Sequence, residues 1–265
     1  MNSFVAIGRP PIPPGANTTS GHGLALRSWL RSSLRWSAAG VGLAAIGYAT
    51  YVGVTWARYG RVSRPDPDEQ DALLDRFMPV SDIVERHHTY VAAPAAVTLA
   101  VAQDMSLSDS PIVRAVFKGR ELLLGAEPGA RPRRGLLEDM QSLGWGILAE
   151  TPGQEIVVGA VTKPWEPNVT FRSVPQEAFR AFNEPDYVKI VWTLRADAIG
   201  ATQSIFRTET RAVATDRSAR AKFRRYWSFL SPGIILIRWL MLGPVRAEAE
   251  RQARLTCSRR ARGPA

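Results

Sequence analysis

YVKIVWTLRA at positions 187–196 and ATQSIFRTETRAV at 201–213 alternate apolar or small side chains with charged ones. Trp192 and Phe206 fall on the apolar side of this alternation, and Arg207 falls on the charged side. Because successive side chains of a strand point to opposite faces, a period of two predicts two long antiparallel β-strands. We expect the charged face of this sheet to be solvated and the apolar face to be covered.

The sequence after position 216 changes period, and apolar side chains recur there at steps of 4, 3, 4, 3 and 4. This spacing predicts a helix with one apolar stripe about five turns long, kinked at Ser231-Pro232-Gly233. The stripe consists of Phe223, Trp227, Leu230, Ile234, Ile237 and Met241. A helix of this kind can cover the apolar face of the sheet. The predicted fold class is therefore α+β, with an antiparallel sheet gripping a long C-terminal helix.

An uncharged run, SAAGVGLAAIGYATYVGVTW, extends from Ser37 to Trp56. As a helix it would reach across the ~30 Å hydrocarbon core of a bilayer, and arginines flank it on both sides. A buried soluble helix would need a domain around it, and a signal peptide usually has a shorter apolar run nearer the start. The later run 229–242 is too short for a span and contains Pro232 and Arg238. We therefore predict one transmembrane helix, near the N-terminus.

These patterns divide the chain into five parts. The parts are a flexible basic segment at 1–35, a transmembrane helix at 36–58, a linker at 59–79, an α+β domain at 80–250 and a basic disordered tail at 251–265. Within the domain, Thr151-Pro152-Gly153-Gln154 is expected to join two strands as a β-hairpin.

The formal net charge of +10 is confined to the two ends of the chain. Residues 1–64 contain seven arginines and 251–265 contain five, neither with an acid, so 65–250 carries a net charge of −2. A folded domain close to neutral argues against nucleic acid as a partner, and basic ends suit membrane lipids. Three arginines precede the span and three follow it closely, so the positive-inside rule gives a tie. The sequence therefore does not determine on which side of the membrane the α+β domain lies, and we prefer the cytoplasmic side.

The order of the predicted elements resembles the START-like helix-grip superfamily (SRPBCC), which includes polyketide cyclase/dehydrase and lipid-transfer families. The resemblance is carried by a strand at 83–91 running into Ala93-Pro94-x-x-Val97, by the strands over 145–213 and by the terminal helix over 216–250. Members of the superfamily grip a hydrophobic or amphipathic ligand between a curved sheet and the long helix, and many are not enzymes. The resemblance thus implies ligand binding and transfers no catalytic residue.

The strand and helix phases predict the lining of such a cavity. Its expected residues are Trp192, Phe206, Thr208 and Thr210 from the sheet and Trp227 and Ile234 from the helix. Arg207, Glu209 and Arg211 form a row of alternating charge on the other strand face, which we interpret as a solvated ladder. A second interpretation places Arg207 and Glu209 inside the cavity as polar anchors.

Catalytic and metal motifs are not found in the sequence. It contains no H-E-x-x-H, G-x-S-x-G or Walker loop. His87 and His88 are adjacent on a predicted strand, so their side chains should point to opposite faces and cannot share a metal. The lone cysteine, Cys257, excludes an internal disulfide. We therefore expect no catalytic site, metal or cofactor.

Three hypotheses for function remain from the sequence. The preferred one is a membrane-anchored binding module for an apolar or lipid-like ligand. The second is a cyclase/dehydrase-type enzyme that uses an acid such as Glu209 as general acid or base. The third is a structural membrane protein with a filled core.

The predicted span can be tested by membrane fractionation. Because twenty uncharged residues partition into hydrocarbon, the full-length protein should stay in the membrane pellet after a carbonate wash. Deletion of 37–56 should release it, and release of the intact chain would contradict the prediction.

Overall fold

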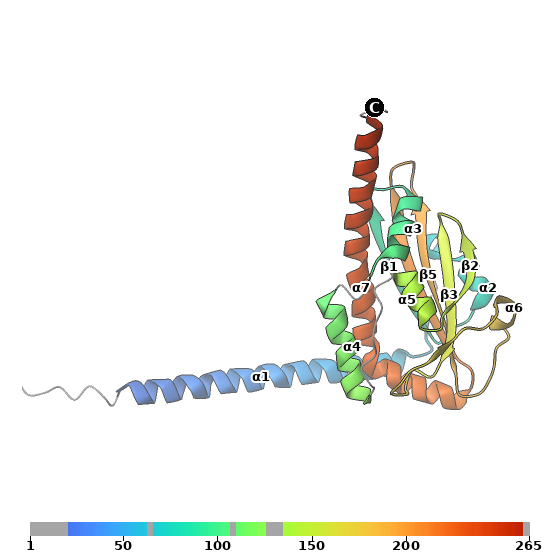
Figure 1. The fold of residues 1–265 in the computed structure, drawn as a ribbon. Coiled ribbons are helices and arrows are strands. Elements are labelled where there is room, and N and C mark those ends of the chain that lie inside the picture. The colour runs from blue at the N-terminus through green and yellow to red at the C-terminus, as the bar shows by residue number, and fades with distance from the viewer. Residues whose placement is uncertain (1–20, 63–65, 107–109, 126–134, 262–265) are drawn as a thin grey trace, which may run out of the picture. The chain divides into compact units, whose positions relative to one another are not determined.

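The computed structural model describes residues 21–62, 66–106, 110–125 and 135–261 (Figure 1). The described residues form two units, which divide between Thr50 and Tyr51. The helices are α1 (Gly21–Arg58), η1 (Pro67–Glu69), α2 (Ala72–Phe77), α3 (Ala95–Asp104), α4 (Pro111–Leu124), α5 (Leu136–Ser142), α6 (Gln176–Phe179) and α7 (Arg217–Ala261). The strands are β1 (Ile83–Val91), β2 (Gly146–Thr151), β3 (Glu155–Thr162), β4 (Phe171–Arg172), β5 (Val188–Ala198) and β6 (Ser204–Ala214).

The strands form one antiparallel sheet in the order β1-β6-β5-β3-β2, with β4 paired to β3. The two long alternating segments are neighbours in it as β5 and β6, as predicted. The predicted β2–β3 hairpin is also confirmed, and its turn is closed by a hydrogen bond from Gln154 N to Thr151 O of 3.0 Å. Gly153 has a φ of 72° at the third position of this turn, a conformation that glycine adopts without strain.

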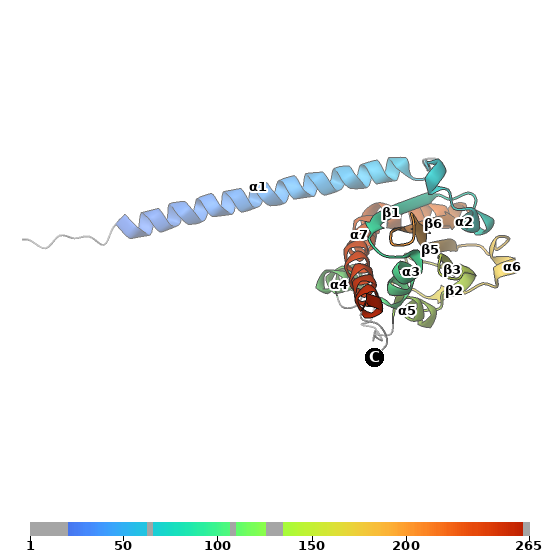
Figure 2. The same ribbon diagram turned by 90° about the horizontal axis from the view of Figure 1, so that it is seen from above.

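The inner face of the sheet, defined as the face toward α3 and α7, carries the main core (Figures 1 and 2). Trp192 and Phe206 pack there in one cluster with Met241 of α7. A second cluster lies further toward the start of α7 and contains Phe223 and Trp227. The predicted class, α+β with a sheet gripping a long C-terminal helix, is confirmed.

The outer face of the sheet, opposite α7, is covered as well. Leu74, Phe77 and Met78, from α2 and its end, pack with Val157 and Val191 of the sheet and are at most 4% exposed. The prediction of a sheet solvated on one face is therefore wrong. The same contacts correct the predicted linker, because residues at 71–78 form a capped helix that belongs to the core.

Helix α7 is one continuous helix that changes direction in its first half (Figure 1), in keeping with the kink predicted around Pro232. It continues past the predicted domain end at 250 and ends at Ala261, so the prediction of a disordered tail from 251 is wrong. Good helix formers extend it, with ion pairs such as Arg251–Glu248 at 2.6 Å.

Helix α1 begins at Gly21, so residues 21–35 of the predicted flexible segment are helical. The rest of that segment, 1–20, lies outside the described residues. Two helices of the described chain are long and apolar enough to cross a membrane, within Gly40–Arg58 and Arg217–Ser258. No part of the first stretch is buried, whereas α7 packs on the sheet. Length and composition make α1 a candidate span, as the sequence predicts, and α7 passes the same test as a core helix can.

Trp227→Ala tests the packing of α7. Trp227 is 6% exposed and its ring lies 6.1 Å from that of Phe223, so truncation should destabilise the fold by about 3–5 kcal/mol through the void it leaves. Arg225 is exposed on the same helix, and Arg225→Ala should change the free energy of unfolding by less than about 0.5 kcal/mol. Equal shifts of the unfolding midpoint in the two variants would contradict this packing.

Candidate functional site

A groove of about 330 Å³ lies beside α7, where the chain passes from α3 to α4. This volume falls in the range of small-molecule sites. Pro244 has no N–H, so the carbonyl of Leu240 lacks the helical bond that residue 244 would otherwise donate. The apolar wall thus includes a backbone acceptor that is free of its usual helical bond. The groove is lined by Met105, Ser106, Ser110, Val113, Leu240, Met241 and Pro244.

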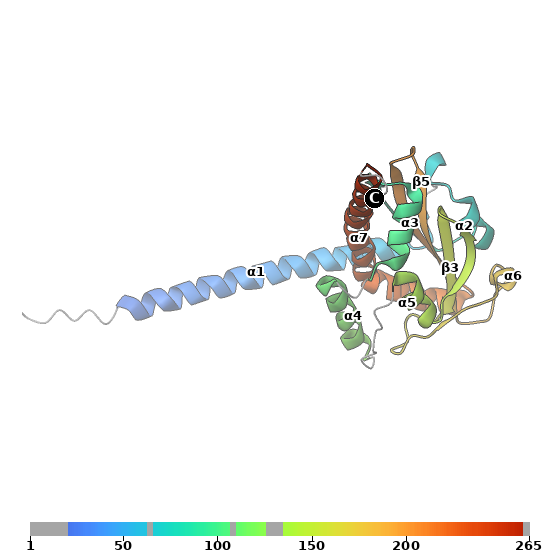
Figure 3. The same cartoon turned by 45° about the horizontal axis from the view of Figure 1, so that its top comes forward.

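Helix α4 lies beside α7 next to this groove (Figure 3). Ser110 caps it by accepting a hydrogen bond from Val113 N, and Pro111 follows at the first helical position. The close approach depends on Gly233 of α7, where an added Cβ would come within 2.9 Å of Val116 Cγ1. A side chain at 233 would therefore force the Val116 side chain to move.

A row of polar side chains crosses the inner face close to α7. The strand register pairs Glu85 with Thr210 and Thr210 with Trp192, and it pairs His87 with Thr208 in the next row. Directly paired residues share a face, so all five side chains lie on the inner face. The sheet therefore carries polar groups between its two apolar clusters.

Arg238 of α7 projects toward this row. Its Cζ lies 5.2 Å from the centre of the Trp192 ring, which is a cation–π contact. The ring is fixed in turn, because Trp192 Nε1 donates a hydrogen bond to Thr208 Oγ1. The helix thus brings one positive charge over the centre of the inner face.

Three polar atoms of this cluster lack partners. In the described part of the chain, the buried side-chain atoms without a hydrogen bond are His87 Nε2, Thr210 Oγ1 and Arg238 Nε. Leaving such an atom unsatisfied costs about 1–3 kcal/mol. His87 and Thr210 lie in adjacent rows of the inner face, and Arg238 lies over the Trp192 ring that pairs with Thr210, so a polar group bound on this face would find donors there.

Burial sets the protonation of the cluster. It raises the pKa of Glu85, an effect that the Arg238 charge opposes. It lowers the pKa of His87, with a further contribution from Arg238 and His88, so His87 is neutral at pH 7. Burial also lowers the pKa of Arg238 to about 10, which leaves the guanidinium charged. His87 Nε2 and Glu85 Oε2 lie 4.0 Å apart, which is too far for a hydrogen bond.

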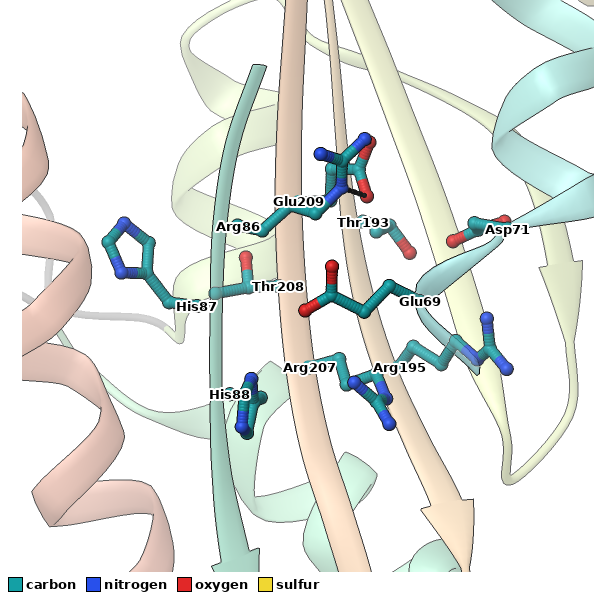
Figure 4. A pocket seen from close by; sticks show the side chains of 10 residues that line it. All are labelled: Glu69, Asp71, Arg86, His87, His88, Thr193, Arg195, Arg207, Thr208 and Glu209. Atoms are coloured by element: carbon teal, nitrogen blue, oxygen red, sulfur yellow. Dashed lines mark hydrogen bonds and ion pairs between the residues drawn. The ribbon is translucent and has the colours of Figure 1, made fainter. Parts of the chain in front are cut away.

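The outer face holds a second, smaller pocket of about 20 Å³, room for about one water (Figure 4). Figure 4 shows the His87 ring on the α7 side of β1, with Arg86, Arg207 and Glu209 on the opposite side. His88 pairs with Arg207, so the two histidines occupy opposite faces as predicted. Among the described residues no cluster of three or more metal-binding side chains is found.

The row that the sequence predicts as a solvated ladder is largely buried beneath α2. Glu209 and Arg211 are each 5% exposed. Arg86 Nε and Arg211 Nε donate to the Glu209 carboxylate at 2.8 and 2.6 Å, and Arg211 also donates to the carbonyl of Met78 at 2.8 Å. The interpretation as a solvated ladder is corrected because the segment taken for a linker covers these residues. Arg207 and Glu209 lie on the outer face, away from the groove.

A buried acid lies beside this network. Glu155 is 6% exposed and accepts a hydrogen bond from Thr193 Oγ1 at 2.9 Å. Burial and the neighbouring Asp71 carboxyl raise the pKa of Glu155 to about 8. At pH 7 the protonated Glu155 can donate to Asp71, which also caps α2 by accepting from Leu74 N at 2.8 Å.

The structure divides the predicted lining residues between two places. Trp192, Phe206, Thr208 and Thr210 lie buried on the inner face beside Arg238, and Trp227 packs in the cluster nearer the start of α7, with Ile234 against it. None of the six lines the 330 Å³ groove. They remain predictions as ligand contacts.

Arg238 was missed by the sequence interpretation, which treated it only as a charge that interrupts a second span. A signal for it exists, because it follows Ile234 by four residues and precedes Met241 by three, on the sheet-facing stripe. A charged residue at such a position indicates a buried role or a ligand contact.

Comparisons with known proteins give fold-level likeness only. No family model and no curated protein matches the sequence. Among solved structures, the di-domain aromatase/cyclase BexL from the BE-7585A biosynthetic pathway is 13% identical over 63% of this chain, with a TM-score of 0.24. The matched part is 46% of BexL, so the chain spans about half of that protein.

Two further structures match over more of their own length. The Zhui aromatase/cyclase from Streptomyces sp. R1128 is 14% identical over 64% of this chain and 94% of its own, with a TM-score of 0.21. Norcoclaurine synthase from Thalictrum flavum, in complex with dopamine and hydroxybenzaldehyde, is 14% identical. The match covers 73% of this chain and 98% of the synthase, with a TM-score of 0.24. At these scores the likeness carries no argument about function, which must come from the site itself.

Glu155 predicts a pH dependence of stability. Its pKa is raised from about 4.5 to about 8 in the folded state, so the folded state binds more protons between these values. The stabilisation is complete below about pH 4.5 and is lost as the pH rises to about 8. In thermal unfolding of the detergent-solubilised protein from pH 5 to 8.5, Glu155→Gln should flatten this decline. Glu150→Gln, at an exposed site on β2, should decline with pH as the wild type does. If the unfolding midpoint falls equally with pH in all three proteins, Glu155 is not the group responsible.

Proposed function

We propose that the chain is a membrane-anchored binding module for an amphipathic, lipid-like small molecule held between α4, α7 and the inner face of the sheet. The observation that carries the proposal is the groove of about 330 Å³ next to a buried cluster of polar atoms without partners. Ligand sites typically combine an apolar wall with a few polar groups that fix orientation.

Met241 connects the groove with the inner face. It lines the groove, is 3% exposed, and belongs to the same core cluster as Trp192. It follows Arg238 by one turn of the helix on the sheet-facing side. Because methionine side chains are flexible, Met241 is well suited to admit a ligand from the groove toward Arg238.

The anchor supports the same function. The last turns of α1 contact α7: Tyr51 Oη and Ser231 Oγ are 2.9 Å apart, and Arg224 donates to the carbonyl of Trp56 at 2.7 Å. Tyr59, just beyond, packs edge-on against Phe223. A domain fastened to the end of a membrane helix experiences lipid-like ligands at high effective concentration.

Catalysis is not part of the proposal. The acid considered for a cyclase/dehydrase-type reaction, Glu209, lies on the outer face and is engaged by Arg86 and Arg211. A general acid or base has to reach the substrate, and the proposed ligand lies on the other side of the sheet.

Native mass spectrometry of the full-length protein, released from detergent micelles, tests the binding function. It should detect co-purified lipid-like molecules in the wild type. Ser106→Trp places a large side chain in the groove and should remove them while the protein stays folded.

The matched control is Ser142→Trp, an identical change at an exposed residue at the end of α5. This variant should retain the bound molecules. Loss of the signal in both variants, or retention in both, would contradict a ligand in the groove.

A further inference from the structure

Arg238 is a positive charge placed where the fold otherwise buries apolar side chains. Its neighbours on the sheet-facing stripe, Ile234 and Met241, pack against the two core clusters. Its guanidinium lies against the Trp192 ring at 5.2 Å, and its Nε is buried without a hydrogen bond. Arg238 as a whole is half-buried, but an unpaired charge with a buried donor atom is uncommon in proteins, because removing such atoms from water is costly.

In the part of the chain that the structure describes, no acid neutralises this charge by direct contact. Within the described residues, no carboxylate forms an ion pair with Arg238, and the nearest acid to act on it is Glu85 on β1. By contrast, on the outer face Arg86 and Arg211 are both paired with Glu209. The unpaired arginine is thus a specific feature of the inner face.

The three atoms without partners can all donate hydrogen bonds, and the acceptor beside them is the Glu85 carboxylate, 4.0 Å from His87 Nε2. The guanidinium has only donors, Thr210 has a rotatable hydroxyl, and a neutral His87 donates from Nε2 in one of its two tautomers. Thr210 is 5% exposed, so water competes poorly for its hydroxyl. A ligand oxygen with negative charge is a suitable acceptor for the Arg238 guanidinium and the Thr210 hydroxyl.

We propose that the inner face binds the carboxylate of a monoanionic amphiphile, such as a long-chain or polycyclic carboxylic acid. Arg238 and Thr210 donate to its oxygens, and its apolar body extends past Met241 into the groove. One unpaired cation matches one negative charge, and Glu85 disfavours a second, so a carboxylate fits better than a phosphate dianion. The inference rests on the proposed binding function and specifies its ligand class.

The test uses the full-length protein in detergent with two probes, fluorescent cis-parinaric acid and its methyl ester. The two share an apolar body and differ in the carboxylate. The acid should bind at least about tenfold more tightly than the ester, because a charge-assisted hydrogen bond exceeds a neutral one by at least that factor.

Arg238→Met keeps the length of the side chain and removes its charge. It should weaken binding of the acid about tenfold or more and leave the ester unchanged. Thr210→Val keeps the shape of the side chain and removes its hydroxyl, so it should weaken binding of the acid several-fold. Arg225→Met, at an exposed position of the same helix, is the control and should bind both probes as the wild type does.

Thermal unfolding separates a ligand contact from a structural role. Arg238 is half-buried and has no ion-pair partner among the described residues, so Arg238→Met should not lower the unfolding midpoint. A lowered midpoint together with equal loss of acid and ester would show that Arg238 is structural and overturn the inference. Equal binding of acid and ester by all proteins would also overturn it and leave the binding function intact, whereas binding of neither probe would argue against both.

Discussion

The packing of α7 across the inner face of the sheet is the contact on which the rest of the domain depends. Neither element can bury its apolar side alone: β5 and β6 present Trp192 and Phe206, and α7 presents Phe223 and Trp227. The helix is long enough to cross the sheet, and its change of direction in its first half (Figure 1) accompanies its contact with two separate apolar clusters. The polar row and Arg238 lie between those clusters. The candidate site is thus a consequence of how the helix crosses the sheet.

The outer face shows how the same sheet accommodates charge. Glu209 and Arg211 are buried there, but each has a charged partner, and the arginine also donates to a backbone carbonyl. Burying an ion pair is tolerated when its hydrogen bonds are satisfied in this way. The inner face lacks this compensation at Arg238, His87 and Thr210. The contrast between a satisfied and an unsatisfied polar cluster is the reason the proposed ligand is placed on the inner face.

The junction between α1 and the domain links the candidate anchor to the candidate site. Tyr51 and Trp56 belong to α1, yet they contact the first third of α7, the helix that also carries Arg238 and one wall of the groove. Arg224 stacks on the Trp56 ring at 4.3 Å besides binding its carbonyl. These contacts all lie within the unit that begins at Tyr51.

The sequence alone determined the elements whose pattern is local. Period two in β5 and β6 and the 3–4 spacing in α7 follow from backbone geometry, so the α+β class, the face of Trp192 and Phe206 and the kink were predictable. The elements that cover each face of the sheet are distant from its strands in the sequence, so local patterns do not predict them. The segment 59–79 is short, polar and rich in proline near its centre, and only its contacts with Val157 and Val191 show that it is a core element. The surroundings of Arg238 were likewise decided by the tertiary structure, because only the fold shows that this charge lies against the Trp192 ring, on the face that carries the unbonded Thr210 hydroxyl.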